Sequence, residues 1–319
     1  MSVKRWGSLV LGCLGLLLSL NAQAVQDPKS ITIGLSLPQL ANPWYIEAKA
    51  GMEKACTELG IKCVAIDAHN SVEKQHDDIQ GMIDGQYDAI LASALDMGKL
   101  TSLYAKAKKQ GIITASLAQT IPHSDLYYNV DEHGYGYEIG AQAANWAKKN
   151  LKCKAKVALI TQDNLVTVKA RGNGAERALK QICPEIEIVA RYHADDPYRG
   201  MNVMDWILPS HPDLNMVVTT TDASAIGSYL ALQVNEISGK DIAVFSGDAT
   251  QDALHMIAED NSVFRGTVNL YPFQGGYDSV MRLYEMVQNG APAFPKFETL
   301  PYTALSQEQV RSGDYERSF

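Results

Sequence analysis

The sequence predicts a protein of the α/β class, with two lobes whose parallel sheets are joined by a hinge of several strands. Three observations lead to this prediction. Apolar strand-like runs alternate with amphipathic helical stretches, which is typical of βαβ units. The runs are rich in Val, Ile, Leu and Ala without a two-residue alternation, as expected of strands covered on both faces. The alternation pauses at 119–128, around Pro122, which indicates a crossing between lobes.

The predicted strands and helices follow one another with short connections. The strand-like runs span 31–37, 63–68, 89–95, 112–118, 156–162, 187–193, 216–221, 242–248 and 265–270. The helical stretches between them span 43–59, 72–85, 99–111, 136–151, 168–182 and 224–237. Several of these helices end at a glycine, including Gly60, Gly85 and Gly111, as expected where a helix stops. A short strand at 126–130 and a helix at 275–288 complete the series.

The interruptions of this pattern predict how the chain is divided. We expect a cleaved leader at 1–24, a first lobe made of 25–130 plus 271–297, and a second lobe made of 131–270 plus 298–319. The chain would return to the first lobe near Tyr271 and cross again through the proline-rich stretch at 291–301. Repeated crossings of this kind would form a hinge of several parallel strands.

The first residues are typical of a secretory leader. Lys4 and Arg5 give a basic start, and the apolar run Leu9–Leu20 is too short to span a bilayer. A small-x-small cleavage site follows at 22–24. A membrane anchor and a lipid attached to Cys13 are the alternatives. We therefore expect an exported, periplasmic protein.

Four cysteines remain once the leader is removed, an even number in an oxidising compartment. Cys56 lies near the end of a predicted helix and Cys63 in the strand that follows. Cys153 lies at the start of another strand, and Cys183 at the end of the helix after it. Because each pair is local within its own unit, we predict the disulfides Cys56–Cys63 and Cys153–Cys183. A metal site is the alternative, although no Cys-x-x-Cys pair occurs.

The balance of charge argues against one class of partner. The chain has 28 Lys and Arg against 36 Asp and Glu. Without Lys4 and Arg5 of the leader the count is 26 against 36, a net charge of −10. Binding to nucleic acid needs a basic face that displaces counterions. We therefore expect no nucleic-acid partner.

The sequence shows no convincing motif for catalysis or for a cofactor. The run GYGYEIG, Gly134–Gly140, looks like a dinucleotide loop, but its third glycine is one residue too far and it comes late in the chain. The 7 His residues have no standard metal spacing, and no G-x-S-x-G or H-E-x-x-H pattern occurs. We predict a binding protein rather than an enzyme, with neither a metal nor a cofactor.

The segment that joins the first strand to the first helix indicates a binding site. It reads ITIGLSLPQLANPW and places Trp44 and Tyr45 at the point where the helix begins. In an open α/β sheet, ligands meet the protein at the carboxyl ends of strands. The Asn42 amide beside two flat rings suits a ligand with polar edges and CH-rich faces. Asn42 can also cap the helix that Pro43 starts.

Motifs along the chain occur in the order of a known family. They are NPWY after the first strand, RGNGAERAL at 171–179, TTTDASAIG at 219–227 and FSGDATQDAL at 245–254. From Ile31 to about Ala304, the chain resembles periplasmic substrate-binding proteins of the type I class, the ribose- and galactose-binding group related in fold to LacI-type regulators. The resemblance implies two Rossmann-like lobes that close over a ligand and deliver it to an ABC importer.

The resemblance also implies ligand contacts in the first lobe. These are expected from Asn42, Trp44, Tyr45 and Ser93. Ala118 and Gln119 occupy the positions where relatives that bind simple aldoses carry Asp-Arg, so two charged hydrogen-bonding groups are lost. We expect Gln119 to make a neutral contact. We also expect the ligand not to be a standard hexose or pentose in the usual pose.

In the second lobe and at the hinge, the resemblance implies a further set of contacts. They are Asp131, Lys169, Asp222, Asp248 and Asn269. Lys169 aligns with an Arg and keeps its charge without the planar fork, while Arg171 is interpreted as structural. The pair Thr221-Asp222 would divide two roles, ligand contact and helix cap. A structural alternative holds for several of these residues: a solvated Lys169, an N-cap at Asp248 and a hinge contact at Asp131.

Together, these predictions describe an exported monomer that closes over one small polar ligand, such as a sugar, a polyol or a related neutral compound. The expected partner is the membrane permease of an ABC importer. A second partner stays open, because some proteins of this fold dock on the periplasmic domain of a sensor histidine kinase, as the TMAO-sensing and autoinducer-binding relatives do. The missing Asp-Arg pair favours keeping that alternative.

Overall fold

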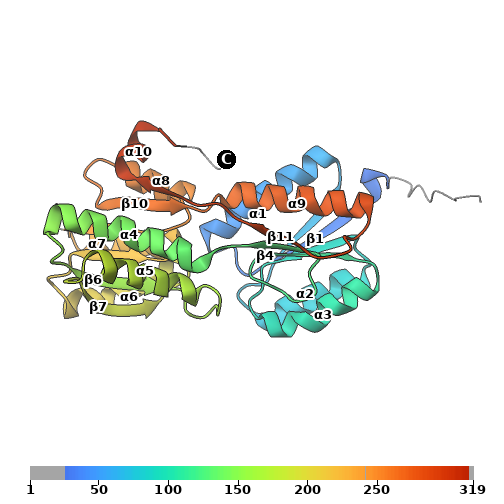
Figure 1. The fold of residues 1–319 in the computed structure, drawn as a ribbon, viewed down its shortest axis with the longest axis horizontal. Helices are drawn as coiled ribbons and strands as arrows, with labels where there is room; N and C mark the ends of the chain where they lie inside the picture. Colours follow the sequence, from blue (N-terminus) through green and yellow to red (C-terminus); the bar gives the residue numbers. More distant parts are fainter. Residues whose placement is uncertain (1–25, 241, 316–319) are drawn as a thin grey trace, which may run out of the picture.

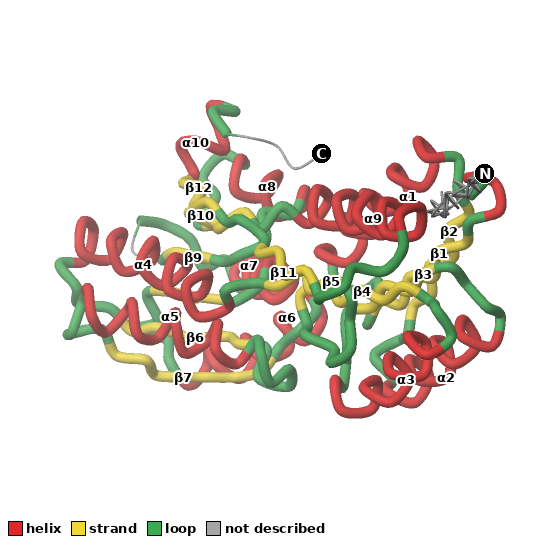
Figure 2. The backbone as a smooth tube through the Cα atoms, turned by 45° about the vertical axis from the view of Figure 1, so that its right-hand side comes forward, coloured by secondary structure: helices red, strands yellow, loops and turns green. Residues whose placement is uncertain are grey.

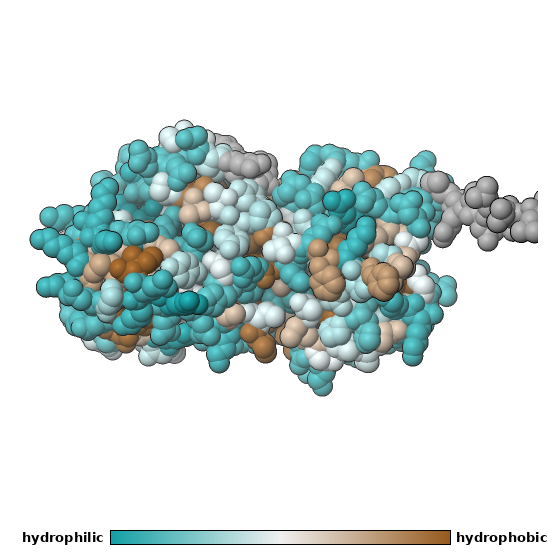
Figure 3. All heavy atoms as spheres, viewed as in Figure 1, coloured by the Kyte–Doolittle hydropathy of each residue, from teal (hydrophilic) through white to brown (hydrophobic). Residues whose placement is uncertain are grey.

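The computed structural model describes residues 26–240 and 242–315 of the chain. The predicted leader lies outside them. The described chain forms two α/β lobes beside each other, each built on a six-stranded sheet (Figure 1). Most of the outer surface in view is hydrophilic, with small apolar spots on both lobes (Figure 3). Within these residues, the structure contains no helix with the length and apolar character that a membrane span requires.

The sheet of the first lobe is parallel throughout, with the strand order β11-β5-β4-β3-β1-β2. Its strands are β1 (Thr32–Leu37), β2 (Lys62–Asp67), β3 (Ala89–Ala92), β4 (Ile113–Ala118), β5 (Leu126–Asn129) and β11 (Lys296–Thr299). The helices of this lobe are α1 (Pro43–Leu59), α2 (Val72–Asp84), α3 (Met97–Lys109) and α9 (Pro272–Asn289). The pair α1 and α9 covers one face of the sheet, and α2 and α3 cover the other (Figures 1 and 2).

The sheet of the second lobe has the order β12-β10-β9-β8-β6-β7, and β12 joins it as an antiparallel edge strand. Its strands are β6 (Lys156–Thr161), β7 (Glu187–His193), β8 (Met216–Thr219), β9 (Ala243–Phe245), β10 (Phe264–Asn269) and β12 (Thr303–Ser306). The helices are α4 (Glu132–Leu151), α5 (Lys169–Ile182), α6 (Pro197–Ser210), α7 (Asp222–Val234), α8 (Gln251–Ala258) and α10 (Gln307–Ser312). The sequence pattern missed α6, which contains Gly200 and Pro209, and the short helix α8.

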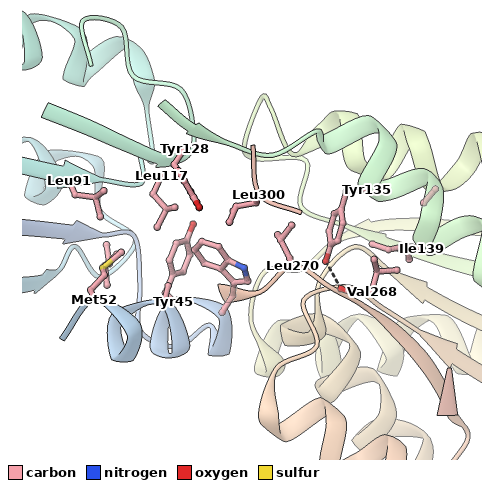
Figure 4. Close-up of a cluster of buried hydrophobic side chains, with 14 of the residues drawn as sticks. Tyr45, Met52, Leu91, Leu117, Tyr128, Tyr135, Ile139, Val268, Leu270 and Leu300 are labelled. Atoms are coloured by element: carbon pink, nitrogen blue, oxygen red, sulfur yellow. Dashed lines mark hydrogen bonds between the residues drawn. The ribbon is translucent and has the colours of Figure 1, made fainter. Parts of the chain in front are cut away.

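The chain passes between the two sheets three times: from β5 to α4, from β10 to α9, and from β11 to β12. The apolar core continues through these crossings. Leu270 and Leu300 lie on crossing segments between the two lobes, with Tyr45 and Tyr128 on one side and Tyr135 on the other (Figure 4). The Tyr271 hydroxyl donates to Thr303 Oγ1 at 3.1 Å and ties two crossings together.

The glycine run at 134–140 is part of helix α4 and serves packing. A Cβ at Gly136 would overlap the Arg171 carbonyl, and one at Gly140 would overlap the Ala175 carbonyl. These glycines therefore let α5 lie directly against α4, because no side chain separates the two backbones. The resemblance of this run to a dinucleotide loop has this structural explanation.

Both predicted disulfides are confirmed. Cys56–Cys63 joins the end of α1 to β2, and Cys153–Cys183 joins the segment before β6 to the end of α5. Each bridge closes a connection within one lobe, and neither restrains the hinge. The bridges use all four of these cysteines, so the alternative of a metal site formed by them is wrong. Among the described residues, no group of three or more His, Cys, Asp or Glu side chains could hold a metal ion.

Candidate ligand-binding site

A small cavity lies between the two lobes, where strands from both sheets end. Its lining consists of Asn42, Trp44, Tyr45, Ala118, Gln119, Gln162, Leu165, Val168, Arg171, Thr221, Asp248 and Leu270. Gln119 follows β4, Gln162 follows β6 and Asp248 follows β9, which is where open α/β sheets bind ligands. The free volume between these side chains is ≈ 30 Å³. A larger hollow of ≈ 820 Å³ lies near the amino ends of strands in the first lobe, away from this edge.

Asn42 performs two tasks at the start of α1. Its extended backbone precedes Pro43, the first helical residue, and its Oδ1 accepts a hydrogen bond from Trp44 N at 2.9 Å. The predicted helix cap is thus confirmed. The Asn42 Nδ2 donates to the carbonyl of Asp195, in the second lobe, at 3.4 Å. The same side chain therefore fixes the aromatic pair and links the two lobes.

Trp44 and Tyr45 form an aromatic corner of the cavity. Their ring centroids are 5.0 Å apart and their planes meet at 85°, an edge-to-face contact. The Tyr45 hydroxyl lies 3.3 Å from Ser93 Oγ, and burial raises the pKa of Tyr45 to about 12. The Trp44 Nε1 is buried and has no hydrogen-bond partner among the residues that the structure describes. This corner thus combines two apolar ring surfaces with a donor that can still bind an acceptor.

Gln119 provides a neutral polar group from the end of β4. It lines the cavity together with Ala118, and neither side chain carries a charge. The Thr167 hydroxyl, in the loop before α5 of the second lobe, donates to Gln119 Oε1. The first lobe therefore offers amides and aromatic rings to the cavity, but no ionised group.

A buried ionic network forms the second lobe's side of the cavity. Arg171 donates to Glu132 Oε2 at 2.7 Å and to the Thr220 carbonyl at 3.1 Å, and its Nη1 lies 3.6 Å from Asp248 Oδ1. The Tyr135 hydroxyl donates to Asp248 Oδ1 at 3.2 Å, and the guanidinium lies over the Tyr135 ring at 4.6 Å. Burial raises the pKa of Asp248 well above its usual value, and the charge of Arg171 opposes that rise.

The structure assigns Arg171 is buried and lines the cavity, whereas Lys169 is exposed and does not. The two residues are two positions apart on α5, which places them roughly 200° apart around the helix. Only one of them can therefore face the cleft. The helical period was the signal that could have selected Arg171, given that the helix packs on α4.

The pair Thr221-Asp222 divides its roles as expected, with Thr221 lining the cavity and Asp222 behind it. Asp222 is fully buried and accepts hydrogen bonds from Thr250 N at 2.6 Å, from Thr267 Oγ1 at 2.9 Å and from Ser246 Oγ. Burial raises the pKa of Asp222 to about 6. This carboxyl group holds the loop that carries Asp248.

Three other predicted residues lie outside the cavity lining. Ser93 is buried and contacts the Tyr45 hydroxyl, so it positions a ring. Asp131 is exposed and accepts from Gly134 N at 3.0 Å, which makes it the cap of α4. Asn269 Oδ1 accepts from Tyr271 N at 2.8 Å, at the second crossing. Lining residues that the sequence analysis did not select are Gln162, Leu165, Val168, Arg171, Thr221 and Leu270.

The geometry can now be compared with known proteins. The sequence model of a family described as "Periplasmic binding protein domain" matches residues 33–291, most of the chain. The chain belongs to this family. It is 30% identical over 235 residues to the ribose import binding protein of Bacillus subtilis, covering 73% of this chain and 74% of that protein. Like its relatives, this periplasmic binding protein is a solute-binding protein of the type I class.

Solved structures show the same fold as this periplasmic binding protein. A 5-methylthioribose transporter solute-binding protein from Thermotoga lettingae has a TM-score of 0.81 at 20% identity, covering 90% of each chain. A solute-binding protein from Bacillus halodurans with bound myo-inositol has a TM-score of 0.79 at 21% identity, covering 92% of this chain and 99% of that one. At this level of identity, the likeness concerns the fold.

Proposed function

We propose that the protein captures a compact, neutral, polar ligand, a small sugar or polyol, between its lobes and delivers it to an ABC importer. The observation that carries this proposal is the cavity, to which one lobe gives an aromatic corner and the other gives hydrogen-bonding groups. Closing the lobes over a ligand lets it gain contacts that neither lobe offers alone. No turnover of the ligand is expected.

The chemistry of the lining favours a neutral ligand with hydroxyl groups. The Trp44 and Tyr45 rings suit the CH groups of a polyol or sugar, and the Trp44 Nε1 and the Gln119 amide suit its hydroxyls. The positive charge of Arg171 is compensated inside the protein by Glu132 and Asp248. The cavity therefore offers no uncompensated charge that would attract an ion.

The size of the cavity favours a compact ligand. A water molecule needs about 10–15 Å³ of such volume, and the cavity provides ≈ 30 Å³. Solute-binding relatives are named for ribose and for 5-methylthioribose transport, and one structure holds myo-inositol. The relatives support the class of ligand. The small volume and the uncharged Ala118-Gln119 support a ligand smaller than a hexose, or a sugar bound in a different pose.

A thermal-shift screen tests this proposal. The panel contains glycerol, xylitol, myo-inositol, ribose, allose, galactose and glucose. A compound present at 100 times its Kd stabilises the native state by about 2.7 kcal/mol, so a true ligand raises the melting temperature clearly. The proposal fails if no sugar or polyol shifts it. Tight binding of ribose, galactose or glucose in calorimetry would contradict the inference drawn from the missing Asp-Arg pair.

The partner requires a separate test. A permease and an ATPase encoded beside the gene support delivery to an importer. A histidine kinase encoded there supports the alternative of a sensor. Stimulation of the importer's ATPase in vesicles by the loaded protein would then confirm delivery, and a lack of stimulation would contradict it.

A further inference from the structure

Three hydrogen bonds join the side chains of the first lobe directly to the second. Two of them involve the cavity residues Asn42 and Gln119. The third lies outside the cavity lining and joins Glu47, on α1, to Gln251, the first residue of α8. These residues are 204 positions apart in the sequence. The contact is therefore a property of the closed arrangement of the lobes.

The Glu47 carboxyl group is half satisfied in this contact. Its Oε1 accepts the Gln251 backbone N–H at 2.6 Å. Its Oε2 is buried and has no hydrogen-bond partner in the part of the chain that the structure describes. Closure thus removes one carboxylate oxygen from water without replacing its hydrogen bonds, which is costly for a charged group and much less costly for a protonated one.

We propose that Glu47 is a positioning residue that makes closure of the lobes depend on pH, favouring the closed arrangement when protonated and opposing it when charged. The proposal rests on the proposed function in one respect: closure is the step that captures the ligand. Glu47 itself lies outside the cavity lining. It therefore acts on closure and not through contact with the ligand.

The charges around Glu47 agree with this role. Burial raises its pKa to about 7, and the nearby carboxylates of Asp222 on α7 and Asp252 on α8 raise it further, while the Gln251 N–H opposes the rise. The amino end of α8 favours the charged form, but burial outweighs it. On opening, the side chain meets water and its pKa returns towards the ordinary 4.5.

The sign of the effect follows from these two pKa values. Between pH 4.5 and about 7 the closed state binds more protons than the open state. Closure is therefore fully favoured by this group below pH 4.5, and that advantage is lost as the pH rises through about 7. Asp222 and Asp248 also have raised pKa values, but the hydrogen bonds shown for both lie within the second lobe.

Small-angle X-ray scattering of the ligand-free, full-length mature protein between pH 5.0 and 8.5 tests the proposal. We expect the wild type to be more compact at pH 5.0, with a closed-to-open ratio at least about tenfold higher than at pH 8.5. Glu47→Gln keeps the acceptor for Gln251 N–H without a charge and should stay compact throughout. Glu53→Gln changes an exposed carboxylate of the same helix and should behave as the wild type does.

A second variant tests the direction of the effect. Asp252→Asn removes one carboxylate that raises the pKa of Glu47, so the transition should move to lower pH. The proposal is overturned if the wild type shows no change with pH, if Glu47→Gln follows the wild type, or if Asp252→Asn moves the transition upward. Because no ligand is present, failure of the sugar or polyol proposal would leave this result unaffected.

Discussion

The two lobes contribute different chemistry to one cavity. The first lobe provides Trp44, Tyr45 and the uncharged Gln119, held by a helix cap and by packing. The second lobe provides Asp248 and Arg171, held by a buried network of ions and hydroxyl groups. The difference teaches that one jaw is suited to the apolar faces of a ligand, and the other fixes polar atoms in place before the ligand arrives.

The difference also concerns stability. A buried ion pair adds little net stability, but removing one partner leaves an uncompensated charge. Loss of an aromatic residue from the first lobe costs packing and leaves no charge stranded. The second lobe is therefore the more sensitive to change, and the following predictions can break or sharpen this contrast.

The largest expected effect comes from Arg171→Met. This variant leaves Glu132 and Asp248 buried without their cation, and we expect the free energy of unfolding to fall by about 3–5 kcal/mol. Arg282→Met is the matched control, because Arg282 forms exposed ion pairs in the first lobe and should cost less than about 1 kcal/mol. Urea denaturation measures both. Equal losses would remove the contrast between the lobes.

The disulfides allow a second comparison of the lobes. The bridge of the second lobe joins cysteines 30 positions apart, and that of the first lobe joins cysteines 7 apart. The entropy of the closed loops predicts a loss of about 3.5 kcal/mol for the double variant Cys153→Ser and Cys183→Ser. For Cys56→Ser with Cys63→Ser it predicts about 2.5 kcal/mol. Thermal unfolding of both proteins gives the order, and the reverse order would count against the account.

The smallest expected effect concerns the support of the aromatic corner. Ser93→Ala removes the hydroxyl beside Tyr45 and should lower the free energy of unfolding by about 1 kcal/mol. The reciprocal variant Tyr45→Phe removes the other member of this contact. The two changes combined should cost little more than either alone, because they delete one interaction. Additive losses in a double-mutant cycle would show that the contact is not formed.

Local features of the fold and site could be predicted from the sequence. The Asn42-Pro43 helix start, the aromatic pair and both disulfides follow from neighbouring residues. Such features depend on short stretches of chain, where helix caps and strand ends have recognisable residue types. Gln119 and Asp248 also lie in the cavity because each follows a strand that the pattern shows.

The remaining site residues depend on packing that the pattern does not contain. The choice between Lys169 and Arg171 is made by the face of α5 that meets α4. Leu165 and Val168 line the cavity from a loop, where no period marks the buried face. The contact of Glu47 with Gln251 depends on how the lobes meet, and no local signal in the sequence carries that information.

Titration calorimetry with the compound found in the thermal-shift screen tests the central claim most directly. If both lobes hold one ligand, the wild type binds it in a one-to-one complex, and Trp44→Ala and Asp248→Asn each weaken binding at least about tenfold, since each loses a contact in the centre of the site. Full affinity in either variant would show that the ligand is held by a single lobe, and that result would contradict the account.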